Sequence, residues 1–123
     1  MRSLSVVVLQ SDSMVAQSLL NSLSSCFRSV RSARSLGDLR ASIARTRAEV
    51  VVVDMETASL KEIADLSREF PKARIVCTHR LADEAMWAAA LGAGAADVCP
   101  SSDTHGILTA ALSSLTRTRP AAA

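Results

Sequence analysis

Aromatic residues are scarce in this sequence, whose 123 residues include two Phe, one Trp and no Tyr. Proteins that bind single-stranded nucleic acid stack the bases on aromatic rings, so this class is disfavoured. An excess of charge of one sign is also lacking, because 14 basic and 12 acidic residues leave a net charge of +2. Binding to DNA or to an anionic membrane needs a stronger and more concentrated positive charge. We therefore expect no direct nucleic-acid partner and no membrane partner.

Cysteine and glycine motifs are missing as well. The three cysteines are an odd number without CxxC or metal-ligand spacing, so they encode neither a disulfide framework nor a zinc site. No GxGxxG or GxxxxGK[ST] motif follows an apolar run, which argues against a phosphate-binding loop for dinucleotides or nucleoside triphosphates. No GxSxG motif does so either, which argues against the serine nucleophile of a hydrolase. The apolar run at residues 4–9 is too short for a signal peptide, and the longest uncharged stretch, residues 85–96, is too short to cross a bilayer. These absences predict a cytoplasmic protein.

Enough apolar material is present for a single core, since 49% of the residues are hydrophobic and the mean hydropathy is +0.23. Patterned sequence extends from the start of the chain to about residue 116. We therefore expect one domain over residues 1–116. Residues 117–123 carry no pattern and are expected to form a disordered tail or a linker stub.

Short apolar runs alternate with helical patterns along this domain. The runs at residues 4–9 and 50–53 are nearly continuous, which is typical of strands that are covered on both faces. Shorter runs lie at residues 74–77 and 96–99, and a weaker one lies at residues 28–33. Helical periodicity follows each run, with Asp12 as an N-cap and a capping-box-like start from Ser35 to Asp38. This alternation predicts an α/β fold, a doubly wound five-stranded parallel sheet between two helical layers.

Ligands of such a sheet bind outside the carboxyl ends of the strands, so the residues that close each strand are the candidates for a site. Asp54 closes the third strand and Thr78 closes the fourth. Asp54 has a plain alternative role as a cap of the following turn. Thr78 has one as a strand-end hydroxyl bonded to a backbone carbonyl. His79 either fills space, occludes the crevice or ligates a metal.

The segments at residues 6–20, 49–54, 74–78 and 90–98 resemble the receiver domains of bacterial two-component response regulators. The resemblance covers residues 4–115 and implies the flavodoxin-like strand order 2-1-3-4-5. It assigns Asp54 to the phospho-acceptor position and Thr78 to the switch hydroxyl that contacts the phosphoryl group. It implies a non-enzymatic module of two-component phosphorelay signalling.

The sequence departs from the family pattern at several of its functional positions. Receivers place two acidic residues after the first strand, where this chain has Gln10 and Ser11. Asp12 follows at the helix N-cap, and a one-residue shift of register would return it to the crevice as a residual acid. The family lysine after the fifth strand corresponds to Ser101, and the aromatic switch of that strand corresponds to Val98.

Transfer of a phosphoryl group to a carboxylate requires a divalent cation, and Mg²⁺ is normally held by one or two carboxylates with substrate oxygens. Asp54 alone makes a poor cage, so we expect Mg²⁺ binding to be weak or absent and no other cofactor. The first hypothesis is therefore a pseudo-receiver that works through protein–protein contacts. The alternatives are an active receiver phosphorylated on Asp54 by a histidine kinase and, further behind, a small flavodoxin-like ligand-binding domain or enzyme.

The resemblance also implies an interaction face, made by the fourth helix, the fifth strand and the fifth helix. Met86 and Trp87 lie in the fourth helical pattern among small alanines that permit close approach. A core position and an exposed anchor are equally compatible with Trp87. We expect a homodimer or a protein partner at this face, with a histidine kinase as one candidate partner.

Overall fold

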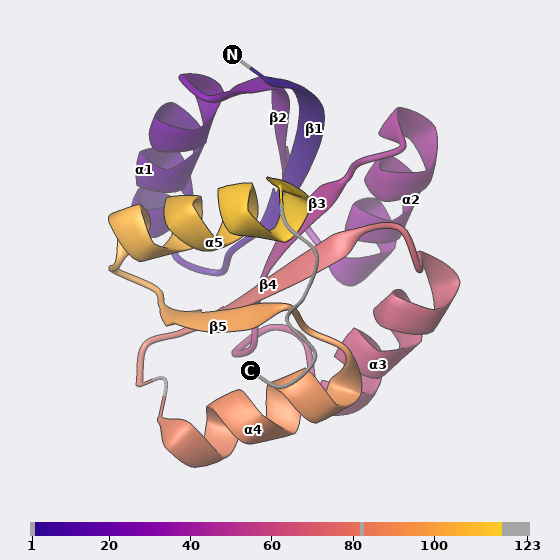
Figure 1. Ribbon diagram of the computed structural model, residues 1–123, viewed down its shortest axis with the longest axis vertical. Coiled ribbons are helices and arrows are strands. Elements are labelled where there is room, and N and C mark those ends of the chain that lie inside the picture. Colours follow the sequence, from indigo (N-terminus) through magenta and orange to yellow (C-terminus); the bar gives the residue numbers. More distant parts are fainter. Residues whose placement is uncertain (1, 82, 117–123) are drawn as a thin grey trace.

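The computed structural model describes residues 2–81 and 83–116, which alternate between strands and helices (Figure 1). The elements in chain order are β1 (Arg2–Leu9), α1 (Ser13–Ser24), β2 (Phe27–Ala33), α2 (Leu36–Thr46), β3 (Val50–Asp54), α3 (Leu60–Glu69), β4 (Arg74–His79), α4 (Glu84–Ala93), β5 (Asp97–Pro100) and α5 (Thr104–Thr116). All strand pairs are parallel, in the order β2-β1-β3-β4-β5. The predicted fold is confirmed. The expected tail at residues 117–123 lies outside the described residues.

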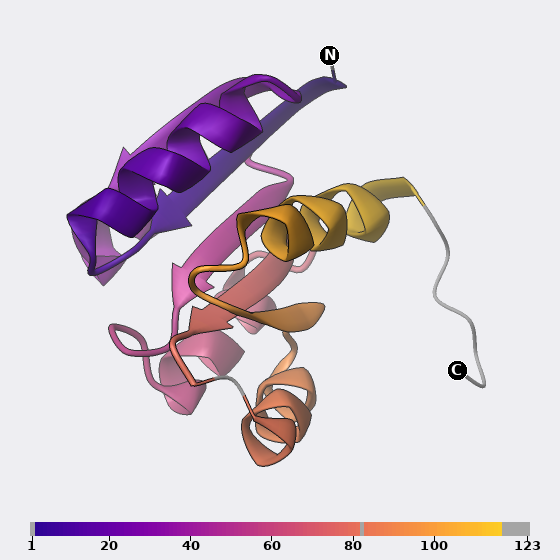
Figure 2. The same ribbon diagram turned by 90° about the vertical axis from the view of Figure 1, so that its left-hand side faces the viewer.

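The sheet separates two apolar clusters, because successive side chains of a strand point to opposite faces. On one face, Val6 and Val8 of β1 pack with residues of α1 and α5. On the other face, Val7 and Leu9 pack with residues of α2, α3 and α4. Figures 1 and 2 show α1 and α5 on the side of the sheet away from α3 and α4. Apolar residues can follow one another in these strands because both faces are covered. Burying a valine side chain on either face contributes about 1.5–3 kcal/mol to folding.

Polar caps fix where the helices begin. Asp12 is the N-cap of α1, as predicted, and its Oδ1 accepts hydrogen bonds from the backbone N–H groups of Met14 and Val15. Ser35 caps α2, because its hydroxyl accepts a hydrogen bond from Asp38 N. The second hydrogen bond of the predicted capping box, from Ser35 N to the Asp38 side chain, is not found among the described residues, so this half of the prediction is wrong. The Asp38 side chain accepts from Arg34 N, at 2.9 Å, instead of from the N-cap residue. Each cap sets the length of the loop that precedes its helix.

A complete capping box begins α3. The Ser59 side chain accepts from the backbone N–H of Glu62, and the Glu62 side chain accepts from the backbone N–H of Ser59. This S-x-x-E signal is present in the sequence but was not part of the predicted pattern. It ends the loop after β3 at residue 59, close to the end of the strand.

The switch point of the sheet lies between β1 and β3. The chain leaves β1 through α1 on one face and leaves β3 through α3 on the other, so the two loops diverge and open a crevice at the carboxyl ends of the strands. The register places Asp54 of β3 beside Thr78 of β4. This arrangement brings the ends of β1, β3 and β4 to one edge of the sheet.

All three cysteines are free, and the two buried thiols lie in different clusters. Cys77 of β4 packs in the cluster of α2, α3 and α4, whereas Cys99 of β5 packs in the cluster of α1 and α5. Burial raises the pKa of the Cys77 thiol to about 12. Burial, with smaller contributions from Asp97 and Asp103, raises the pKa of the Cys99 thiol to about 11. Both thiols are therefore protonated and poorly nucleophilic at neutral pH.

No helix within residues 2–81 and 83–116 is both long enough and apolar enough to cross a bilayer.

Candidate functional site

Asp54 ends β3 with a fully buried carboxylate that accepts four hydrogen bonds. Its Oδ2 accepts from Ser11 Oγ at 2.5 Å, from Ser11 N at 3.2 Å and from Thr57 Oγ1 at 3.3 Å. Its Oδ1 accepts from Glu56 N at 2.9 Å. A buried carboxylate is unfavourable unless donors compensate for lost water, and here neutral donors do so. Two of these donors, Glu56 N and Thr57 Oγ1, belong to the following turn, which gives Asp54 the capping role considered from the sequence.

Thr78 lies beside Asp54 and is also fully buried. Its Oγ1 accepts a hydrogen bond from Gln10 Nε2 at 3.1 Å. The alternative of a bond between this hydroxyl and a backbone carbonyl is not seen among the described residues. Gln10 and Ser11, the two neutral residues after β1, therefore contact the Thr78 hydroxyl and the Asp54 carboxylate respectively.

The other candidates from the sequence lie around this pair. Asp12 is exposed and is held at the start of α1 by its capping bonds. Ser101 follows β5 and is 5% exposed. Val98 is buried among the residues that face α2, α3 and α4, and it pairs in register with Cys77. His79 is half-buried, and its Nδ1 accepts from Leu81 N at 3.0 Å, so its ring caps the next turn.

A cavity of about 270 Å³ opens beside the ends of β1 and β5. Its lining residues are Gln10, Ser11, Asp12, Val15, Glu56, Arg80 and Ser101. Arg80 Nε donates to both carboxylate oxygens of Glu56, at 3.1 and 2.9 Å, and so joins the loop after β3 to the loop after β4. Sequence reasoning missed this pair. The only sign of the pair in the sequence is its position, because Glu56 lies two residues after Asp54 and Arg80 lies two residues after Thr78.

Within the described part of the chain, no group of three or more His, Cys, Asp or Glu side chains is placed to hold a metal ion. The carboxylates of Asp54 and Asp12 already accept hydrogen bonds from the protein, and that of Glu56 is paired with Arg80.

Trp87 on α4 is 45% exposed. Its indole Nε1 donates to Asp97 Oδ1 of β5 at 3.2 Å, which holds one edge of the ring against the strand. Met86 is half-buried, and Leu81 in the preceding loop is 75% exposed. Ala90 is the buried residue of α4. Of the two interpretations from the sequence, the exposed position describes Trp87 better than the core position.

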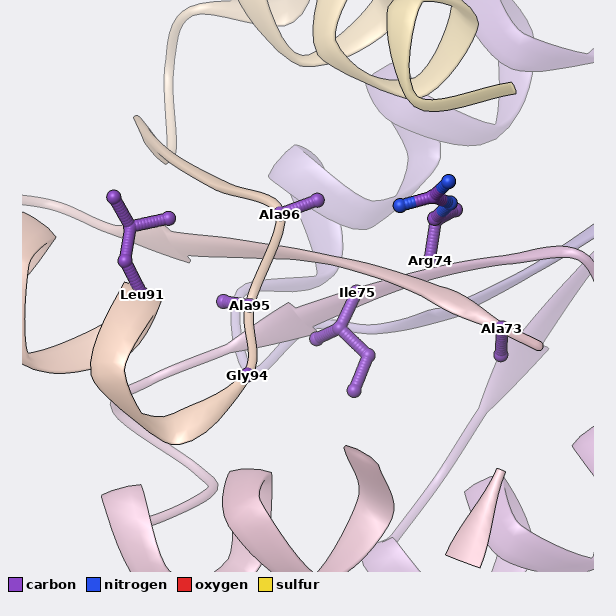
Figure 3. Close-up of a pocket in the computed structure, with 7 residues that line it drawn as sticks. All are labelled: Ala73, Arg74, Ile75, Leu91, Gly94, Ala95 and Ala96. Atoms are coloured by element: carbon purple, nitrogen blue, oxygen red, sulfur yellow. The ribbon is translucent and has the colours of Figure 1, made fainter. Parts of the chain in front are cut away.

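A second cavity, of about 280 Å³, lies away from this site, at the beginning of β4. Figure 3 shows Leu91 of α4 on one side of residues 94–96 and Arg74 and Ile75 of β4 on the other. Thr78 is at the opposite end of the same strand. This cavity therefore does not belong to the strand-end site.

Comparisons with known proteins identify the fold. No protein-family model matches the sequence, and no curated protein matches it. The structure is similar to a response regulator from Thermotoga maritima, with 19% identity over 94% of this chain and 99% of that one and a TM-score of 0.84. It is also similar to the N-terminal signal receiver domain of a two-component system response regulator from Bacteroides fragilis, with 19% identity, coverage of 93% and 98%, and a TM-score of 0.83.

A third similar structure is the isolated REC domain of RcsB from Salmonella enterica serovar Typhimurium in the presence of phosphomimetic BeF₃⁻. It shares 17% identity over 98% of this chain and 95% of that one, with a TM-score of 0.77. At these identities the similarity establishes the fold. The chain has the receiver-domain fold, with the flavodoxin-like strand order predicted from the sequence.

Proposed function

We propose that this protein is a receiver-type signalling module that acts through protein contacts and does not depend on Mg²⁺-assisted phosphorylation of Asp54. The observation that carries the proposal is the set of four hydrogen bonds to the Asp54 carboxylate. Ser11 provides two of them, from the loop where the family pattern has acidic residues. An oxygen that accepts these bonds is less available to attack phosphorus and to bind a cation.

The residues around Asp54 do not fit a Mg²⁺ cage. Mg²⁺ requires oxygen ligands in near-octahedral geometry, and negative carboxylates are the protein ligands it favours. Gln10 and Ser11 are neutral, and their polar atoms bond to Thr78 and Asp54. Asp12 is exposed and caps α1. Ser101 offers a hydroxyl where an ammonium or guanidinium group would pair with a phosphoryl group. We infer weak Mg²⁺ binding or none.

The face of α4, β5 and α5 is the surface through which we expect the module to act. Its support is the part-exposed Trp87 and the exposed Leu81, beside the exposed Ala85, Ala88 and Ala89. Small side chains let a partner backbone approach closely, and a tryptophan is a frequent anchor of protein interfaces. The occupant is a second copy of the chain or another protein, and a histidine kinase is one candidate.

An active receiver is the second candidate function, because Asp54 and Thr78 lie side by side at the ends of neighbouring strands. Labelling with a radioactive acyl phosphate and Mg²⁺ separates the two. We expect no labelling of the unaltered protein. The triple variant Gln10→Asp/Ser11→Asp/Ser101→Lys should gain labelling, and Asp54→Asn provides the background. If the unaltered protein labels as strongly as the triple variant and Asp54→Asn does not label, the active receiver is correct and the proposal fails.

A further inference from the structure

The Ser101 hydroxyl is buried without a partner. Its Oγ neither donates to nor accepts from any residue that the structure describes. Ser101 lines the cavity of about 270 Å³ together with Gln10 and Asp12. Buried polar groups in folded proteins nearly always have a hydrogen-bond partner, so a lone hydroxyl beside a cavity indicates a group that enters the cavity.

The charges around the cavity decide which group fits. Glu56 and Arg80 neutralise each other through their ion pair. Asp12 contributes a negative charge to the lining, and the Asp54 carboxylate lies behind Ser11, within hydrogen-bond distance of it. The remaining charge is negative, so the cavity disfavours anions and favours a cation.

The free lone pairs point to the same conclusion. Gln10 uses its Nε2 on Thr78, and its Oε1 accepts no hydrogen bond from the described residues. Asp12 Oδ1 caps α1, while its Oδ2 has no described donor. With Ser101 Oγ, these are three acceptors on residues that line one cavity. Val15 adds an apolar wall.

We propose that this cavity binds a primary alkylammonium group. The three N–H donors of an ammonium match Ser101 Oγ, Gln10 Oε1 and the Asp12 carboxylate, and Val15 contacts the methylene stem. A divalent metal ion suits the cavity less well, because two of these three acceptors are neutral. The group is the side chain of a lysine from a partner protein or a free aliphatic amine, which share this chemistry.

The inference rests on the proposed function in one respect, since it describes the cavity beside an Asp54 that carries no phosphoryl group. The two tests remain separate. Labelling by an acyl phosphate decides the proposed function, whereas binding of an amine to the protein that has never met a phosphodonor decides this inference.

The test is an NMR titration of the ¹⁵N-labelled full chain with N-acetyl-lysine methylamide. We expect saturable shifts of the amides of Gln10, Ser11 and Ser101, with a dissociation constant of about 1 mM, typical of a small group with few contacts. N-acetyl-norleucine methylamide keeps a matching apolar stem without the ammonium and should not bind. The trimethylated lysine keeps the charge without the N–H donors and should bind at least several-fold more weakly.

A free diamine, 1,5-diaminopentane, distinguishes the two sources. Tighter binding of the lysine methylamide favours a lysine of a partner protein, and tighter binding of the diamine favours a free amine. Either preference supports the ammonium site. Equal binding of the norleucine or trimethylated probe, or shifts confined to other regions, would overturn it.

Variants test the acceptors. Ser101→Ala and Asp12→Asn should each weaken lysine methylamide binding about 3- to 10-fold, and asparagine keeps the cap of α1 because it is as good an N-cap as aspartate. Ser102→Ala, at the exposed neighbouring position, should bind like the unaltered protein. Ser101→Lys should abolish binding and melt at a higher temperature than Ser101→Met, which fills the cavity without a charge. Unchanged affinity in both acceptor variants contradicts the proposal.

Discussion

Ser11 provides both a backbone and a side-chain donor to the buried Asp54 carboxylate. We predict that Ser11→Ala lowers the free energy of unfolding by about 1–3 kcal/mol, because a buried carboxyl group loses a side-chain hydrogen-bond donor and gains no replacement. Urea denaturation measures the change. Ser102→Ala is the matched control and should change stability by less than about 0.5 kcal/mol. Equal stability of the two variants would mean that water replaces the lost donor.

The Cys77 thiol predicts how stability depends on alkaline pH. Its pKa rises from 9.0 to about 12 on folding, because burial disfavours the thiolate. The folded state therefore holds the proton more tightly than the unfolded state above pH 9. The stabilisation is complete below pH 9 and is lost as the pH rises toward about 12, at up to about 1.4 kcal/mol per pH unit.

Urea unfolding between pH 8 and 10.5 tests this dependence. The unaltered protein should lose stability above pH 9 more steeply than Cys77→Ala, which has no thiol at this position. Parallel curves for the two proteins would show that the folded and unfolded states release this proton over the same pH range, so that burial does not raise the pKa of the thiol. The comparison with the variant removes the contribution of other groups that titrate in this range.

At the scale of a single element, α4 ends at Ala93 and is capped by Gly94, whose φ of 114° lies in the left-handed region. A Cβ at this position would lie 2.6 Å from Ser67 Cβ of α3, so both backbone strain and a clash oppose any other residue. We predict that Gly94→Ala destabilises the protein by about 1–3 kcal/mol. Gly92→Ala is the control, because a Cβ added there would meet no side chain or neighbouring element within 4 Å and alanine favours a helix. A thermal melt in which the control falls as far as Gly94→Ala would refute the explanation.

The elements themselves were largely predictable from the sequence. β1 and β3 are nearly continuous apolar runs, β2 is a weaker one, and Asp12 and Ser35 are typical N-caps, so local chemistry was sufficient to place these elements. The strand order implied by the resemblance puts the ends of β3 and β4 side by side, and the register of the two strands pairs Asp54 with Thr78. Boundaries differed by one or two residues, as at β2, which begins at Phe27 where the pattern indicated residue 28.

Pairings between loops were not predictable. Glu56 and Arg80 are 24 residues apart, in polar loops that follow two different strands. No periodicity of the sequence indicates that these two side chains meet. Trp87 and Asp97 likewise meet only because α4 packs against β5. Such contacts depend on how loops from separate segments are placed in space. A sequence shows the charges and the hydroxyls, but which of them meet depends on the tertiary fold.

At the scale of the whole molecule, the exposed face of α4 is the proposed interaction surface. We predict that the protein self-associates or binds its partner through this face without phosphorylation, and that Trp87→Ala weakens the association by about 2 kcal/mol or more. Sedimentation over a dilution series measures the change. Gln17→Ala, on the exposed side of α1, is a surface control and should leave the profile unchanged. A folded Trp87→Ala protein that dissociates like its parent would exclude this face.

The separation of the core by the sheet has a consequence for its dynamics. Because Cys77 lies in one apolar cluster and Cys99 in the other, each thiol becomes reactive only when its own cluster opens. The rate at which a thiol reagent modifies each cysteine therefore reports the opening of one layer of helices. Single-cysteine variants that retain Cys77 or Cys99 would show whether the two layers loosen together or one before the other. The modification rates of Cys77 and Cys99 thus measure the opening of the two sides of the sheet separately.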